Sequence, residues 1–188
     1  FRPDEEVRRL ARRAVELGID DLFEEGMSVD QVFARLDALG NSGAAWRDEL
    51  ETSRNPWFNV NVGDGFYHYH RSWNDDLSMP FSALPGYIAK LQAGEPIDRP
   101  VAQLIRERDQ LVADYRDLLD SDADRATYDQ LITLAHRVFP YVEGHKFYCE
   151  HWYTNLFFNK IREFGALLAG HGFFAEEADV FHLTHYEL

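Results

Sequence analysis

Several features that define common protein classes are scarce or missing in this chain of 188 residues. The only cysteine is Cys149, so an internal disulfide cannot form and an oxidising compartment is not required. No apolar run approaches the roughly 20 residues of a membrane span, and no signal peptide is apparent. These absences favour a cytoplasmic protein.

Basic residues are also scarce, with 19 Lys and Arg against 33 Asp and Glu and a formal net charge of −14. Nucleic acid and anionic membranes would repel so acidic a chain, which argues against both as partners. The Gly-x-Ser-x-Gly elbow, the P-loop and the Gly-x-Gly-x-x-Gly fingerprint are missing as well. The sequence therefore contains no recognised nucleophile or nucleotide motif.

The length and the 45% hydrophobic content fit one domain with a sizeable core, which we place at residues 1–188. The chain begins at Phe1 rather than at a methionine, and it ends on a Thr184–Glu187 capping box that would open a further helix. We therefore expect this domain to be an excised part of a longer multidomain protein.

A hydrophobic period of about 3.6 residues dominates the chain and predicts a mostly α fold. A Ser28–Gln31 capping box begins one helix, and Asp98, followed by Pro100 in the first turn, is expected to cap another. Short connections between the later helices favour antiparallel neighbours in a helical bundle. The predicted helices cover residues 4–18, 29–40, 43–51, 99–119, 125–139 and 143–170.

Residues 55–86, NPWFNVNVGDGFYHYHRSWNDDLSMPFSALPG, are rich in glycine, proline and aromatic side chains and show no steady helical period. We predict a long ordered loop here, with at most short strands where FNVNV and FYHYH alternate. Long loops inside compact domains are usually functional, which makes this loop a candidate site. Residues 171–184 are predicted to form a second loop with at most one strand.

The helix predicted over residues 143–170 is apolar on most sides, as a core helix is, yet one of its faces is polar. The members of this face recur at spacings of 3, 4, 4 and 3 residues. They are Tyr148, His151, Asn155, Asn159 and Arg162, with His145 and Trp152 at the border. Buried polar groups must be paired or meet water, so the face either lines a cavity or is an ordinary solvent-exposed stripe.

A second polar cluster lies in the predicted loop, in the stretch GFYHYHRSWNDD. If this segment is extended, His68 and His70 share one side, and Asp76 follows within reach. Histidine beside a carboxylate suits general-base chemistry, and His-x-His with a carboxylate also suits a weakly specified metal site. The remaining alternative is that both histidines are hydrogen-bonded in a loop that covers the core.

The C-terminal stretch LLAGHGFFAEEADVFHLTHYEL resembles the segment of phosphoenolpyruvate synthase-like phosphotransferases that leads into their swivelling phosphohistidine domain. The matching residues are Gly172, Asp179, Val180, Phe181, Leu183, Thr184, Glu187 and Leu188. The helix that precedes this stretch looks like the branch of the family that phosphorylates small organic acceptors. The earlier segments FYHYHRSWNDDLSMPF, GYI and LQAGEPIDRP look like the same branch. Phenylphosphate synthase, alkylphenol-phosphorylating enzymes and rifampin phosphotransferase belong to that branch. The resemblance covers residues 55–188 and leaves the first 50 residues unplaced.

Members of this family work in three parts: an ATP-grasp domain takes phosphate from ATP, a swivelling domain carries it on a histidine, and a helical module holds the acceptor. The resemblance implies that this chain is the third part, which binds no cofactor itself, while the full enzyme uses ATP and Mg²⁺. Its implied partners are a small phenol or aromatic alcohol and the other two domains, on the same chain or on another. Alone it would be inactive.

The resemblance also implies roles for the two polar clusters. The implied acceptor-binding residues are Phe66, Trp73, Tyr148, His151, Trp152, Asn155 and Asn159. The four candidate bases for the hydroxyl proton are His70, His68, Asp76 and His145. The histidines rank first because an unperturbed imidazole titrates near neutral pH. Arg162 would steady the phosphoryl oxygens.

Two other functions fit the same residues. One is a non-catalytic helical module that docks or links the swivelling phosphohistidine domain, with the polar face packed on a partner or open to water. The other is a small metalloenzyme that uses His68, His70 and a carboxylate. A closed pocket beside residues 148–162 would favour acceptor binding over docking, and metal analysis would test the metalloenzyme.

Overall fold

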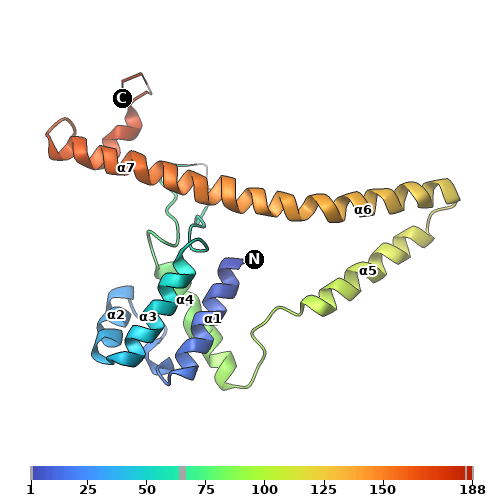
Figure 1. Cartoon of the computed structure of the whole chain (residues 1–188), viewed down its shortest axis with the longest axis horizontal. Helices are drawn as coiled ribbons and strands as arrows, with labels where there is room; N and C mark the ends of the chain where they lie inside the picture. The colour runs from blue at the N-terminus through green and yellow to red at the C-terminus, as the bar shows by residue number, and fades with distance from the viewer. Residues whose placement is uncertain (1, 64–66, 185, 188) are drawn as a thin grey trace. The chain divides into compact units, whose positions relative to one another are not determined.

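The computed structural model describes residues 2–63, 67–184, 186 and 187, which form seven α-helices and shorter 3₁₀ and π-helical segments without a β-strand (Figure 1). The predicted mostly α fold is confirmed. None of the described helices is both long and apolar enough to cross a membrane. The sequence predicted one domain over residues 1–188, and the structure divides these residues into two compact units, 1–97 with 147–188 and 98–146.

The first unit begins with a bundle of short helices. Its elements are α1 (Arg2–Glu16), the 3₁₀ turn η1 (Asp20–Leu22), α2 (Val29–Ala38), α3 (Asn41–Arg54) and α4 (Ser78–Gln92). Helix α1 packs against both α3 and α4, and α2 packs against α3. Ser28 and Gln31 form the predicted capping box at the start of α2. Helix α3 is longer than the 43–51 segment predicted for it.

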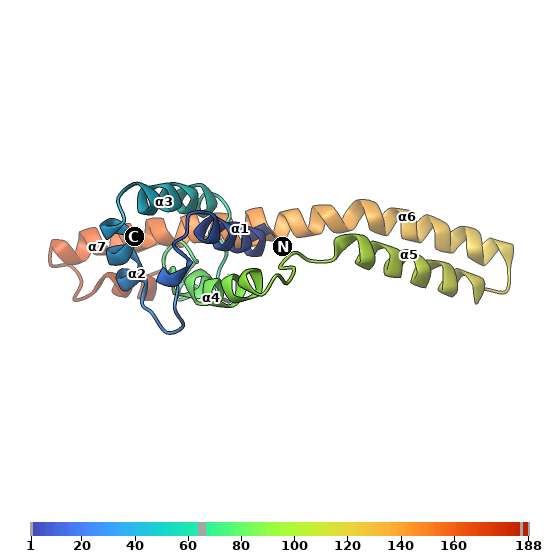
Figure 2. The same cartoon turned by 90° about the horizontal axis from the view of Figure 1, so that it is seen from below.

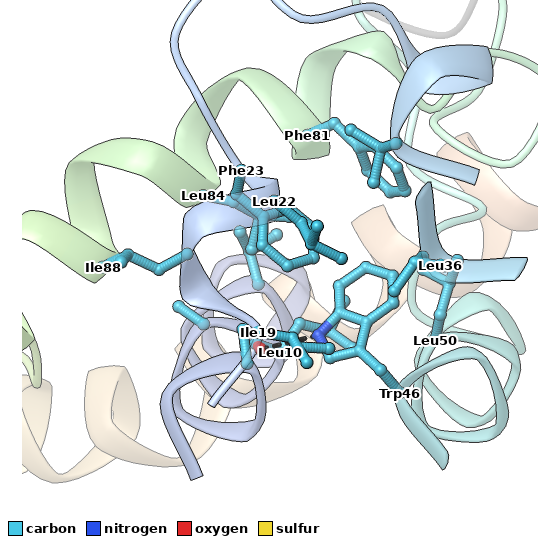
Figure 3. Packing of buried hydrophobic residues seen from close by; sticks show 14 of the residues in the cluster. Leu10, Ile19, Leu22, Phe23, Leu36, Trp46, Leu50, Phe81, Leu84 and Ile88 are labelled. Carbon is cyan, nitrogen blue, oxygen red and sulfur yellow. Dashed lines mark hydrogen bonds between the residues drawn. The ribbon is translucent and has the colours of Figure 1, made fainter. Parts of the chain in front are cut away.

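Trp46 of α3 lies at the centre of this bundle and is fully buried (Figure 3). Its indole Nε1 donates a hydrogen bond to the Leu10 carbonyl of α1 at 3.0 Å, which satisfies the one polar atom of the ring. The rings of Phe23 and Phe81 contact it at centroid distances of 4.8 and 5.8 Å. The first 50 residues, which the resemblance leaves unplaced, therefore supply much of the hydrophobic core.

The loop between α3 and α4 covers residues 55–77 and is shorter than the predicted 55–86, because α4 begins at Ser78. Pro80 lies in the first turn of α4, where a backbone N–H has no intrahelical partner, so proline is tolerated there. Pro85 lies inside the helix, which nevertheless continues to Gln92. The two prolines in a segment without clear periodicity account for the error in the prediction.

Two segments of this loop pair with each other in antiparallel fashion. Asn61 bridges Ser72, and the Trp73 N–H donates to the Val60 carbonyl at 3.0 Å. FNVNV therefore pairs with residues 71–73 of the same loop. FYHYH is the other segment for which a short strand was predicted. The described part of that segment, residues 67–70, forms a turn in which the His70 N–H donates to the Tyr67 carbonyl.

The first unit is completed by the π-helical segment η2 (Lys146–Tyr153), helix α7 (Thr154–Gly170) and the 3₁₀ helix η3 (Glu177–His182). Helix η3 stands where the sequence allowed for a strand, and it packs closely against α7. Gly165 of α7 permits this close packing: a Cβ there would lie 2.2 Å from the Glu177 carbonyl oxygen and 2.9 Å from a Val180 methyl group. The Val180 side chain is buried at this contact.

The second unit is a helical hairpin formed by α5 (Val101–Asp117) and α6 (Asp122–His145), which run antiparallel (Figure 2). Ser121 caps α6, since its hydroxyl accepts a hydrogen bond from the Asp124 N–H at 3.1 Å. Helix α5 starts after Pro100 rather than at the predicted Asp98 cap. Helix α6 continues through Pro140, beyond the predicted end at residue 139.

Neither helix of the hairpin contains a buried residue. The apolar stripes that the sequence predicted for a bundle core are therefore exposed on this unit. The large apolar residues concerned are Val101, Leu104, Ile105, Leu111, Tyr115, Leu118, Leu131, Leu134, Val138, Phe139, Tyr141 and Val142.

Candidate functional site

The predicted polar face on the last long helix is present, and it begins in the π-helical segment η2. A π-helix turn is wider than an α-helix turn, and such turns are frequent at functional sites. His151, Asn155 and Arg162 are buried, Asn159 is half-buried, and the Tyr148 side chain is half-exposed. The partners of these side chains decide what the face does.

His151 and Asn155, two buried members of the face, bind the backbone of the loop at residues 55–77. His151 Nδ1 accepts a hydrogen bond from the Asn61 N–H at 3.4 Å. Asn155 Nδ2 donates to the Asn59 carbonyl at 3.1 Å, and the Asn155 side chain is only 1% exposed. Both contacts join residues at least 90 positions apart in the sequence.

The last two members of the face bind the far end of the same loop. Asn159 Nδ2 donates to Asp75 Oδ1 at 3.1 Å. Arg162 donates to the Asn159 amide oxygen and to the His68 carbonyl. We name His151, Asn155, Asn159 and Arg162 the loop clamp. From the sequence, this face could either line a cavity or be exposed to solvent. In the structure, the four residues of the loop clamp hold the loop instead.

The two predicted histidine bases have different surroundings. The exposed His68 ring stacks on Phe181 of η3, with ring centroids 4.3 Å apart and an interplanar angle of 19°. The half-buried His70 ring meets the edges of Tyr67 and Tyr69 at 5.5 and 4.7 Å. Because residues 67–70 form a turn, the extended arrangement with both histidines on one side does not occur.

Gly63 lies directly against the His70 ring. A Cβ at this position would lie 2.5 Å from the imidazole Cε1, so a larger residue would displace the His70 ring. The backbone at residue 63 therefore forms one wall of the His70 site, and Tyr67 and Tyr69 form others.

The two neighbouring carboxylates of the loop are both engaged in local structure. Asp75 accepts hydrogen bonds from the Ser72 N–H and hydroxyl at 2.9 and 2.8 Å, in addition to its bond from Asn159. Asp76 accepts from the Ser78 N–H at 2.9 Å at the start of α4, and these bonds from Ser78 lower the pKa of Asp76. A carboxylate with a lowered pKa is a poor proton acceptor, which places Asp76 last among the candidate bases.

The aromatic residues predicted as acceptor walls belong to separate groups. Tyr148 and Trp152 contact each other at 5.8 Å, and both contact Phe147, whose ring lies 5.3 Å from Trp57. The half-buried Trp73 packs beside the hydrophobic core instead, against Phe58, with ring centroids 5.7 Å apart. Trp73 is thus better placed to anchor the loop than to contact a ligand.

Two further predicted residues stand apart. His145 ends α6 and belongs to the hairpin unit, where its ring lies 6.3 Å from that of Tyr141. Phe66, the remaining predicted wall residue, lies outside the residues that the structure describes.

Charged side chains gather where the loop, α7 and η3 meet. Arg71 forms an ion pair with Glu177 at 3.7 Å, and both side chains are about half-exposed. Burial lowers the pKa of the Arg162 guanidinium, and repulsion from Arg71 lowers this pKa further. Attraction to Asp75 and Glu177 acts in the opposite direction. Two guanidinium groups therefore lie near each other at this end of the loop clamp.

No role was predicted from the sequence for Arg71 or Glu177, and Asp75 was only a carboxylate near the two histidines, not one of the predicted site residues. The Ser72-x-x-Asp75 spacing is a turn signal that could have shown that Asp75 is a structural acceptor. Nothing in the local sequence indicates that Arg71 and Glu177 meet, because they are more than a hundred residues apart. Arg71, Asp75 and Glu177 interact electrostatically with Arg162, so they are part of the same site as the loop clamp.

Within the described residues, no group of three or more His, Cys, Asp or Glu side chains is arranged to hold a metal ion. Surface hollows of about 320 and 500 Å³ occur elsewhere, on residues 129–137 of α6 and on residues 24–35, which cover the turn before α2 and part of α2 itself. Neither hollow contains a predicted site residue.

No protein-family model, curated protein or solved structure matches this chain. The resemblance to phosphoenolpyruvate synthase-like phosphotransferases therefore stays a prediction that rests on the residues quoted for it. The geometry of the loop clamp, the two histidines and the two arginines is the basis for any functional proposal.

Proposed function

We propose that this chain is the acceptor-binding module of an ATP-dependent, phosphohistidine-mediated phosphotransferase that phosphorylates the hydroxyl of a small phenolic acceptor. One observation carries the proposal beyond the sequence. Two segments that carry the resemblance, the loop at residues 55–77 and the C-terminal stretch, make direct contact. His68 stacks on Phe181, and Arg71 pairs with Glu177.

His70 is the best candidate for the base that accepts the hydroxyl proton. Its ring sits against Gly63 and the edges of two tyrosine rings, which fix its position while leaving it partly exposed. In the transfer, the bond between phosphorus and the carrier nitrogen breaks as the acceptor oxygen bonds to phosphorus. The acceptor proton passes to His70, and the carrier imidazole keeps the electron pair of the broken bond.

Arg162 and Arg71 have different roles in this proposal. Arg162 is buried, and two of its nitrogens already donate to Asn159 and to the His68 carbonyl. We therefore assign it the positioning of the loop rather than contact with phosphate. The Arg71 guanidinium is about half-exposed and carries the positive charge that a phosphoryl group needs nearby.

Aromatic side chains around the loop suit a phenol ring. Tyr67 and Tyr69 stack with centroids 5.2 Å apart, are both exposed, and touch the His70 imidazole. Such flat apolar surfaces beside a base can hold an aromatic ring and orient its hydroxyl group. The Tyr148–Trp152 pair on η2 is the second aromatic surface that an acceptor could use.

Calorimetry on this chain with phenols, alkylphenols and aliphatic alcohols tests the proposal. We expect saturable binding of one phenolic class, weakened about tenfold or more by His70→Gln or by Trp152→Ala. His136→Gln is the matched control, because His136 is exposed on the hairpin. Binding that both site variants leave unchanged would contradict the assignment. In the complete enzyme, unchanged turnover of His70→Gln would exclude the base.

A docking module for the swivelling phosphohistidine domain is the second candidate function. The residues of the loop clamp all form hydrogen bonds within this chain. Tyr67 and Tyr69 are exposed on the loop that the clamp holds and form a surface on which a partner domain could dock, which favours this function. Tight binding of the phosphohistidine domain, lost in Tyr69→Ala, together with no binding of any phenol would favour this function over acceptor binding.

A further inference from the structure

The α5–α6 hairpin exposes more apolar surface than a two-helix unit can cover by itself. Its two helices touch through the Tyr128 hydroxyl, which donates to the Val112 carbonyl at 3.2 Å, and through Arg125, which donates to the Leu119 carbonyl at 2.7 Å. Among the residues on the remaining faces, Leu104 is 47% exposed and Leu134 55%. In four-helix bundles, such faces are buried against a second pair of helices.

The exposed apolar residues are confined to one stripe on each helix. At 100° per residue, the stripe of α5 lies about 50° to one side of the direction set by Val112 and Leu119. The stripe of α6 lies about 100° to one side of the direction set by Arg125 and Tyr128. Since the helices are antiparallel, both rotations lead to the same side of the hairpin. The two stripes therefore form one continuous apolar face.

The charges of the hairpin suit a second copy of itself. Residues 98–146 carry seven basic and ten acidic residues, so their net charge is −3 out of −14 for the chain. The half around the turn, residues 109–133, has a net charge of −5, whereas the ends at 98–108 and 134–146 together have a net charge of +2. Two hairpins that pack in opposite directions bring the acidic half of each against the basic half of the other.

We propose that two copies of this chain associate through these apolar faces, as an antiparallel four-helix bundle with twofold symmetry. The twelve exposed apolar side chains of the hairpin are roughly half-exposed and present on the order of 80 Å² each, so their burial would remove on the order of 1,000 Å² from each copy. A standard interface buries about 800 Å² per partner. The face is large enough for a stable dimer.

Sedimentation equilibrium on the chain tests the association. We expect a dimer of about 44 kDa, twice the 21.9 kDa of one chain. Leu104→Glu and Leu134→Glu should weaken dimerisation at least a hundredfold, whereas Ala113→Glu on the opposite side of α5 should leave it unchanged. Circular dichroism checks that each variant keeps its helices. A monomer at 100 µM, or a dimer that neither leucine variant weakens, would overturn the proposal.

Disulfide trapping tests the direction of packing. In a Cys149→Ser background, Leu111→Cys lies near the middle of the hairpin, where the twofold axis brings the two copies of this residue together. Leu118→Cys lies at the turn, so its two copies would be about 20 Å apart, too far for a disulfide. We expect rapid cross-linking of Leu111→Cys alone. Cross-linking of Leu118→Cys, or of neither variant, would refute the antiparallel arrangement.

Discussion

Replacing Gly165 with alanine would test whether the α7–η3 contact orders the C-terminal part of the site. The added Cβ would lie 2.2 Å from the Glu177 carbonyl oxygen, a backbone atom that cannot rotate away. Alanine gains about 1 kcal/mol of helix propensity, but displacement of η3 would expose Val180, which costs about 1.5–3 kcal/mol. The loss exceeds the gain, so we expect η3 to open more often.

Hydrogen exchange measured by mass spectrometry reports this opening directly. A net loss of about 0.5–2 kcal/mol corresponds to exchange roughly 2–30 times faster over residues 176–184 in Gly165→Ala. Gly144→Ala and Gly170→Ala are matched controls, because these glycines have no heavy atom within 4 Å of an added Cβ. Both controls should leave exchange over residues 176–184 unchanged. Wild-type protection in Gly165→Ala would show that the contact does not hold η3.

Three further predictions concern the clamp, the core and the loop carboxylate. Asn155→Ala removes a buried donor and should lower the free energy of unfolding by about 1–3 kcal/mol in urea titrations, since a buried carbonyl loses its partner. Trp46→Phe loses the bond to Leu10 and leaves a cavity, so we expect a loss of about 2–4 kcal/mol, read as a lower Tm. The lowered pKa of Asp76 means that its bonds from Ser78 stabilise the fold above a pH of about 4 and are lost as the pH falls through the folded-state pKa. The stability difference between wild type and Asp76→Asn should therefore shrink below pH 4, and a difference independent of pH would contradict the assignment.

Helix content could be read from the sequence because each helix has its own local signals. The capping box at Ser28 marks the start of α2, which the structure confirms. The first helix was predicted to end at Gly18, whose φ is +65°, and α1 ends two residues earlier at Glu16. Pro140 gave the opposite signal, yet α6 continues through it. Periodicity also correctly predicted an apolar stripe on each helix of the hairpin, but it could not show that both stripes are exposed on this unit.

The candidate site was predicted as a set of residues and not as an arrangement. The spacing of His151, Asn155, Asn159 and Arg162 placed them on one face, as observed. Their partners lie more than eighty residues away in the sequence, so no local pattern could show that the face holds a loop. The same limit applies to the stack of His68 on Phe181.

The division of the first unit into residues 1–97 and 147–188 has a consequence during synthesis on the ribosome. The loop at residues 55–77 emerges long before the helix whose side chains satisfy its backbone. Asn155 follows Asn59 by 96 residues, which corresponds to about 5–20 seconds at the usual rates of translation. During that interval the helices around Trp46 can already pack, while the loop carbonyls remain bound to water. The loop at residues 55–77 therefore becomes fully hydrogen-bonded only after α7 is synthesised, later than the helical bundle around Trp46.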